Sequence, residues 1–297
     1  MSRQTIRQFA DSAAGERFFG AYDSLLEHWP PDTETRDVLT EHGTTHVNVC
    51  GSPNGRPVIL LPGAGATSAV FGSLAWRLGH THRVFAIDLM GDVGRSVPHA
   101  DRIASIAALH GWFDAVVGAL GVHDFDVVAH SYGAMVAVSR AVAPDSGIAR
   151  LILLDPTSVF TGLSASYLLR ALPLLTMPTE RRQRAFVEWE CAGIVVDPTW
   201  MSVLAIGAAD FPRQRPVVPK KPSKVEFAAI TADVSVVLAG RSKAHSASNV
   251  ARRVDEVLPR ARVVLLDTAS HHSLPLEPAD DVARIVIDCL AHPRRSD

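Results

Sequence analysis

Short, solidly apolar runs alternate along this chain with segments of helical periodicity. Strands that are apolar at every position are buried on both faces, which is typical of a parallel sheet covered by helices on each side. The predicted strands are residues 58–61, 84–89, 125–129, 151–155, 234–239 and 262–266. The predicted helices are residues 70–79, 103–120, 132–144, 247–258 and 278–291. The sequence therefore predicts an α/β fold with a mostly parallel central sheet and helices on both faces.

The first part of the chain has a different pattern. Apolar residues recur at helical spacing through residues 5–28, which predicts one amphipathic helix ended by a pair of prolines. Two short runs of β character follow, at residues 37–40 and 45–50. We therefore predict a helical extension over residues 1–36, placed before the core of the fold.

The segment between the predicted strands at 151–155 and 234–239 is too long for one crossover connection. It contains several helical stretches and then a connector rich in proline and lysine at residues 212–222; the stretches are residues 164–175, 179–192 and 199–208. We interpret residues 156–232 as an inserted helical lid. The α/β core is then formed by residues 37–155 and 233–297.

One strand-to-helix junction carries a serine. The predicted strand at 125–129 is followed by His130, Ser131 and Tyr132, and the predicted helix continues through Gly133. A serine on such a sharp turn has its hydroxyl pushed away from the backbone, and small flanking residues let the strand and the helix pack closely. The stretch has the Gly-x-Ser-x-Gly pattern of a nucleophile elbow, with alanine in place of the first glycine.

Composition excludes several classes of partner. The 297 residues are 47% hydrophobic and carry a formal net charge of −2, so neither nucleic acid nor an anionic membrane surface is an expected partner. No apolar run approaches the roughly 20 residues of a membrane span, and residues 1–11 lack the apolar centre of a secretory signal. The three cysteines are far apart in apolar surroundings, which predicts buried reduced thiols and a cytoplasmic protein. The sequence leaves a homodimer open.

These features together resemble the α/β-hydrolase fold family over residues 37–292. Besides the elbow, three segments carry the resemblance. They are residues 60–65, where Pro62 replaces the family's histidine, residues 85–96, which resemble the family's Asp-x-x-Gly-x-Gly-x-Ser turn with one extra residue, and residues 266–271, which resemble the turn that presents the catalytic histidine. The order along the chain, with the nucleophile early and the histidine late, is that of the family.

The resemblance implies a role for several residues. Ser131 would be the nucleophile, which needs a base to accept its proton. The spacing back from Pro278 favours His271 as that base, whereas the spacing back from Glu277 favours His272; we predict His271.

The family uses two backbone N–H groups to bind the oxyanion of the tetrahedral intermediate, and these map here to the N–H groups of Ala64 and Tyr132. The Gly-Ala-Gly-Ala loop at 63–66 fits this role, because small residues let a substrate oxygen approach the backbone.

The third member of the expected triad is missing from its usual place. The family usually has Asp or Glu three residues after the glycine that ends the penultimate strand, and here that position is Lys243. A base histidine needs an acceptor on its second ring nitrogen, which lysine cannot be. Asp155, at the end of the strand after the elbow's helix, is the substitute that we predict. The alternatives are a Ser–His dyad or a triad that has been partly lost.

The sequence predicts a serine hydrolase that acts on an ester, a thioester or a lactone and needs no cofactor or metal ion. Aromatic and apolar residues in the predicted lid favour a small-molecule substrate with an apolar acyl chain. The alternative is a non-hydrolytic member of the same fold, acting as a cyclase, a lyase or a ligand-binding protein, and Lys243 is its main support.

Overall fold

The computed structural model describes residues 3–99 and 103–291 of the chain. Residues 1–2, 100–102 and 292–297 lie outside the described part, and with them the outer ends of the predicted segments 1–36 and 233–297. The strands of the described part are β1 (Glu34–Thr40), β2 (Gly43–Gly51), β3 (Arg56–Leu61), β4 (His82–Ile87), β5 (Val97–Pro98), β6 (Phe125–His130), β7 (Ile148–Leu154), β8 (Asp233–Ala239) and β9 (Arg262–Leu266).

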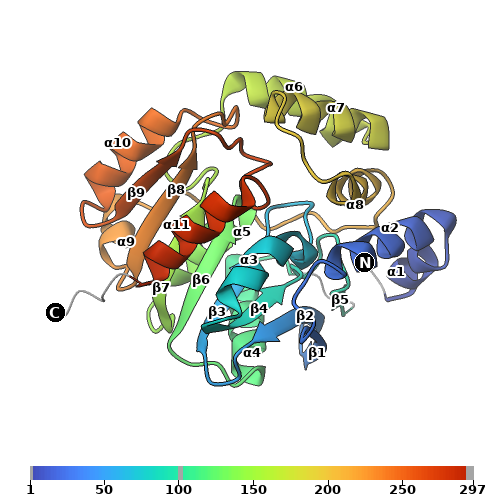
Figure 1. Cartoon of the computed structure of the whole chain (residues 1–297), viewed down its shortest axis with the longest axis horizontal. Helices are drawn as coiled ribbons and strands as arrows, with labels where there is room; N and C mark the ends of the chain where they lie inside the picture. The colour runs from blue at the N-terminus through green and yellow to red at the C-terminus, as the bar shows by residue number, and fades with distance from the viewer. Residues whose placement is uncertain (1–2, 100–102, 292–297) are drawn as a thin grey trace.

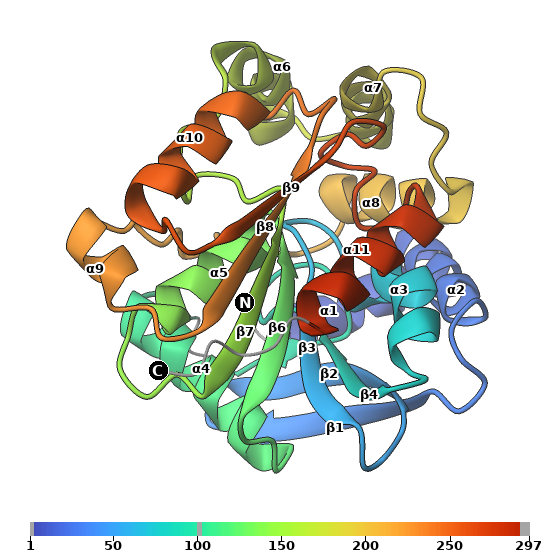
Figure 2. The same cartoon turned by 60° about the vertical axis from the view of Figure 1, so that its left-hand side comes forward.

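All these strands form one twisted sheet, shown in Figures 1 and 2. The order across it is β1-β2-β4-β3-β6-β7-β8-β9, and β5 pairs with β2. The strands from β4 to β9 along this order run parallel, and β1, β2 and β5 join antiparallel at one side. This confirms the predicted fold class, a mostly parallel central sheet. The two-residue β5 has no counterpart among the predicted strands.

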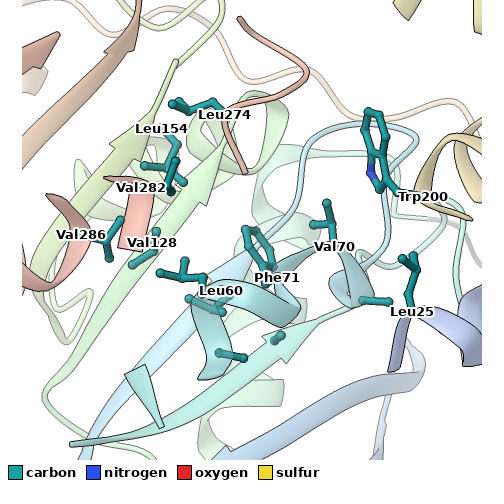
Figure 3. Packing of buried hydrophobic residues seen from close by; sticks show 14 of the residues in the cluster. Leu25, Leu60, Val70, Phe71, Val128, Leu154, Trp200, Leu274, Val282 and Val286 are labelled. Atoms are coloured by element: carbon teal, nitrogen blue, oxygen red, sulfur yellow. The ribbon is translucent and has the colours of Figure 1, made fainter. Parts of the chain in front are cut away.

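Helices cover both faces of the sheet, as predicted. One face carries α3 (Gly72–Leu78) and α11 (Ala279–Ala291); the other carries α4 (Ile106–Ala119), α5 (Tyr132–Ala141) and α10 (Ala247–Val257). Successive side chains of a strand point to opposite faces of the sheet. Leu60 and Val128 pack toward α11, near Val286 (Figure 3). Their neighbours Ile59 and Val127 belong to the core on the opposite face. Because the central strands β3, β6, β7 and β8 are buried on both sides, their sequences are apolar at most successive positions.

The N-terminal segment forms two helices where one was predicted over residues 5–28. These are α1 (Arg3–Ala10) and α2 (Ala13–Leu26). The chain turns at Ser12, whose Oγ accepts the N–H of Gly15 at 3.1 Å as the cap of α2. A Cβ at Gly15 would lie 1.9 Å from the carbonyl oxygen of Phe9, so only glycine lets the second helix start this close to the first.

The segment between β7 and β8 is helical. It contains α6 (Ala165–Thr176), α7 (Glu180–Cys191) and α8 (Pro198–Ala209), then a connector without helix or strand, and the short α9 (Lys224–Ala228), which the sequence did not predict. Figure 1 places α6 and α7 above one end of the sheet, and α8 beside α2. The ring centroids of Phe18 on α2 and Phe211 after α8 are 5.2 Å apart.

The helices of this segment differ in how much they bury. Side chains of α7 and α8, among them Phe186, Val187, Trp200 and Leu204, join the core on the α3–α11 face. In contrast, α6 buries none of its residues, and Leu169 is 71% exposed. No helix in the described part of the chain combines the length and the apolar character needed to cross a membrane.

Candidate active site

Ser131 stands on the turn between β6 and α5. Its backbone angles, φ 51° and ψ −112°, are strained for a residue with a side chain. The N–H of Ser131 donates to the carbonyl oxygen of Leu154 at 3.2 Å. The turn is tight because α5 starts against β3: a Cβ at Gly133 would lie 2.5 Å from the carbonyl oxygen of Leu61. This geometry projects the hydroxyl out of the backbone.

His271 and Asp155 form a hydrogen-bonded line with this hydroxyl. The Nε2 atom of His271 lies 2.9 Å from Ser131 Oγ, and its Nδ1 atom lies 2.7 Å from Asp155 Oδ2. His271 comes from the loop between β9 and α11, 140 residues after Ser131. With Nδ1–H donating to the carboxylate, Nε2 is left with its lone pair toward the serine. The structure thus brings together the three residues that the sequence singled out as nucleophile, base and acid.

Asp155 reaches the histidine because β7 is the neighbour of β6 in the sheet, with Leu154 paired to His130. The chain bends there, at φ 40°. The buried carboxylate also accepts the N–H of Ala239 at 3.0 Å and the hydroxyl of Ser242 at 2.8 Å. Burial alone would raise the pKa of Asp155, but the hydrogen bond and charge of His271 hold it below its usual value. The group is therefore an ionised acceptor.

Of the predicted oxyanion donors, Tyr132 follows Ser131 as the first residue of α5, and Ala64 lies in the loop after β3. In the part of the chain that the structure describes, the N–H groups of both residues lack a hydrogen-bond acceptor. The loop after β3 passes close to the serine, since a Cβ at Gly63 would lie 3.1 Å from Ser131 Cβ. The next N–H, that of Gly65, donates to Asp92 Oδ2 at 2.9 Å, which ties the loop down.

Lys243, which occupies the family's usual acid position, and His272, the alternative base, both contact α7. The Lys243 ammonium contacts the carbonyl oxygen of Trp189 and lies 4.6 Å from the centroid of its ring. His272 Nδ1 lies 3.3 Å from Oε2 of Glu190, on the same helix. Neither side chain takes part in the hydrogen-bonded line at Ser131.

Three residues that sequence reasoning did not assign also contact this line. Glu190 accepts the N–H of His271, and Thr157 Oγ1 lies 3.3 Å from Ser131 Oγ. His130 Nε2–H donates to the carbonyl oxygen of His271 at 2.9 Å. Burial, with the charge of His271, lowers the pKa of His130 to about 3, so its ring is neutral. The position of His130 next to the serine was the only signal of these contacts.

A small pocket adjoins the loop after β3. Its volume is about 160 Å³, and Ala64, His272 and Arg213 are among its lining residues, together with apolar side chains from α6, α7 and α8: Tyr167, Ala171, Leu174, Leu175, Phe186 and Leu204. A larger open cavity of about 1170 Å³ lies by the N-terminal helices and β5, where none of the predicted site residues line it. Its size therefore does not mark the site of chemistry. Among the described residues, no group of three or more His, Cys, Asp or Glu side chains is arranged to hold a metal ion.

Comparisons with known proteins point in one direction. A sequence model of the Alpha/beta hydrolase family matches residues 58–285. Carboxylesterase YbfK of Bacillus subtilis (strain 168) is 30% identical over 159 residues, which are 53% of this chain and 53% of that protein. The chain thus spans about half the length of this curated relative.

Two solved structures from Bacillus subtilis share the fold. Carboxylesterase CesB (YbfK) has a TM-score of 0.86 at 21% identity, covering 95% of this chain and 100% of that one. Naproxen esterase (carboxylesterase NP) has a TM-score of 0.83 at 20% identity, covering 93% of this chain and 98% of that one.

Proposed function

The chain belongs to the α/β-hydrolase family, and on that basis we propose that it is a serine hydrolase that cleaves ester bonds through an acyl-enzyme on Ser131. The hydrogen-bonded line of Ser131, His271 and Asp155 is the observation that carries the proposal. The named carboxylesterase relative supports an ester as the bond that is cleaved.

The first half of the reaction acylates the serine. Ser131 Oγ attacks the substrate carbonyl carbon while His271 Nε2 takes the hydroxyl proton. The ionised Asp155 holds His271 in the tautomer that leaves Nε2 free, and it stabilises the imidazolium that forms. His271 then gives the proton to the departing alcohol, so the ester C–O bond breaks and the acyl group remains on Ser131.

The tetrahedral intermediate carries a negative charge on the former carbonyl oxygen. The N–H groups of Ala64 and Tyr132 are the donors that we propose for this oxygen. Their lack of an acceptor in the described part of the chain supports the role, and each such donor contributes ~2.7–4 kcal/mol to the transition state. In the second half, His271 takes a proton from water as the water oxygen attacks the acyl carbon. His271 then returns that proton to Ser131 Oγ as the bond from Oγ to the acyl carbon breaks, so the acid is released and the free serine is restored.

The substrate that we propose is a small molecule with an apolar acyl chain, as an ester, a thioester or a lactone. The mostly apolar pocket beside Ala64 supports this class. Because α6 and α7 supply much of its lining, we also propose that residues 156–232 act as a lid that sets substrate size. The non-hydrolytic alternative rested on the absence of an acceptor at Lys243; the bond from His271 to Asp155 supplies an acceptor and favours hydrolysis.

The test is hydrolysis of 4-nitrophenyl butyrate together with labelling by a fluorophosphonate. We expect one covalent adduct by intact-mass analysis, absent in Ser131→Ala. Hydrolysis should fall to background in Ser131→Ala and His271→Ala, and the double variant should be barely worse than either, because the two groups act as a unit. His272→Ala should retain most activity.

Hydrolysis that persists in Ser131→Ala would contradict the proposal. A wild-type protein that is neither labelled nor active on any ester would favour the non-hydrolytic alternative. If His272→Ala is the inactive variant, the assignment of the base is wrong.

A further inference from the structure

Glu190 is a fully buried carboxylate on the last turn of α7. Its Oε1 accepts the backbone N–H groups of Lys243 and His271, each at 3.1 Å. Its Oε2 accepts the N–H of His272 at 3.0 Å and faces the Nδ1 atom of the same residue at 3.3 Å. One side chain therefore binds the backbone of two loops that are far apart in the sequence.

These two loops frame the proposed triad. The loop after β8, which includes Lys243, also supplies the hydroxyl of Ser242 that donates to Asp155. The loop after β9 presents His271. Neither loop belongs to a helix or a strand at these positions. The Glu190 carboxylate therefore accepts backbone N–H groups that have no partner in regular secondary structure. Charge-assisted hydrogen bonds of this kind are roughly twice as strong as neutral ones.

The charge of Glu190 is favourable for an imidazolium. Burial alone would raise the pKa of Glu190, but the hydrogen bond and charge of His272 and the charge of His271 hold it far below its usual value. The ionisable groups that face His271 from the elements around it are Asp155 after β7, Glu190 on α7, His130 on β6, His245 before α10, Tyr167 on α6, and the adjacent His272. Asp155 and Glu190 are the carboxylates among them.

We infer that Glu190 is a positioning residue for the reaction: it fixes the loop that carries His271 and adds a second negative charge beside the histidine. The inference rests on the proposed function of Ser131 and His271. Glu190 does not itself line the pocket beside Ala64, so the role that we infer for it is on the base.

The test compares Glu190→Gln with Glu188→Gln, an exposed glutamate two residues away on the same helix. With 4-nitrophenyl butyrate we expect Glu190→Gln to lower kcat about tenfold with KM nearly unchanged. Removing a negative charge disfavours protonation of the base, so the acid limb of kcat/KM should move to lower pH. Glu190→Asp keeps the charge, so it should lower kcat but leave the acid limb in place. Glu188→Gln should match the wild type in all three quantities.

A second readout does not depend on turnover. The proton on His271 Nδ1, bonded to Asp155, should give a low-field proton NMR signal that Asp155→Asn abolishes. We expect the signal to be lost or broadened in Glu190→Gln and kept in Glu188→Gln. If wild-type protein hydrolyses no ester, the proposed function fails, and this signal alone decides the inference.

A Glu190→Gln protein with wild-type kcat, pH profile and low-field signal would overturn the inference and leave the proposed function intact. If Glu190→Gln does not fold, Glu190→Asp decides: a wild-type kcat in that variant would also overturn it, because the shortened side chain cannot keep all four contacts.

Discussion

At the scale of single residues, the bond between His271 and Asp155 is the contact on which the proposed triad most depends. Ser131 and His271 stand in local patterns, a strand-to-helix turn and a late small-residue turn. Asp155 was named because the usual acid position holds lysine and because neighbouring strand ends lie close together, about 5 Å apart. The observed bond from Asp155 to His271 gives this prediction a specific test.

Asp155→Asn should leave the fold intact and cut kcat by a large factor, up to ~10⁴, because asparagine favours the wrong tautomer of His271. The measurement is ester hydrolysis together with the melting temperature. Asp267→Asn, an exposed acid near the same loop, is the control and should be unaffected. Full activity in Asp155→Asn would leave a Ser–His dyad as the working mechanism.

Glu190 shows why the remaining contacts could not be predicted. Its partners are mainly backbone N–H groups, which every residue except proline carries, so no residue pattern records them. The pairing of residue 190 with residues 243, 271 and 272 exists only after α7 has been placed against the loops that follow β8 and β9.

At the scale of elements, periodicity predicted the helices and the parallel strands well, because burial on both faces makes the strands continuously apolar. Periodicity did not predict the features of the fold that depend on short-range contacts. The break between α1 and α2 depends on the cap at Ser12 and the close contact at Gly15, and β5 is too short for any periodicity.

Two helical glycines allow a matched experiment on the elbow. Gly133→Ala should lower the free energy of unfolding by about 1–3 kcal/mol, because its Cβ would meet the backbone oxygens of Leu61 and Pro62, which cannot move easily. This exceeds the gain of alanine over glycine in a helix. Gly20→Ala in α2, where nothing lies within 4 Å, should instead gain about 0.5–1 kcal/mol. Urea unfolding measures both; a stabilised Gly133→Ala protein would argue against the close contact.

The connector after α8 is the element where we expect proteolysis to begin. It has no helix or strand before α9, and Arg213 and Lys220 are exposed. Limited trypsin digestion should cut there first. The Tyr132 hydroxyl donates to the carbonyl oxygen of Val217 at 2.6 Å, so Tyr132→Phe should speed the cut. Protection throughout residues 212–224 would instead indicate a rigid cap.

At the scale of the whole molecule, buried carboxylates link the site to acid stability. The pKa values of Asp155 and Glu190 are lowered in the folded protein, whereas in the unfolded chain they return to about 3.9 and 4.3. Their stabilisation is therefore complete above those unfolded values and is lost as the pH falls. Below the unfolded pKa values, each carboxylate makes the free energy of unfolding fall by up to about 1.4 kcal/mol for each unit that the pH is lowered.

We therefore expect the free energy of unfolding of Glu190→Gln to fall less steeply than that of wild type below about pH 4.5. Urea unfolding at a series of pH values measures the slopes. The wild-type advantage should be largest near neutral pH and shrink on acidification. Glu188→Gln should follow wild type, and parallel curves for wild type and Glu190→Gln would show that folding does not lower the pKa of Glu190.

The order of the proposed triad along the chain determines when its members become available during biosynthesis. Asp155 precedes His271 by 116 residues, and the strands β8 and β9 that bring the histidine loop to the sheet follow α6–α8. A nascent chain that has emerged only as far as β7 carries the serine and the acid but no base. If Ser131 is the nucleophile and His271 its base, as proposed, such a chain cannot activate the serine. Hydrolysis would then begin only once the last parallel strands have joined the sheet, and an incomplete translation product would be inactive.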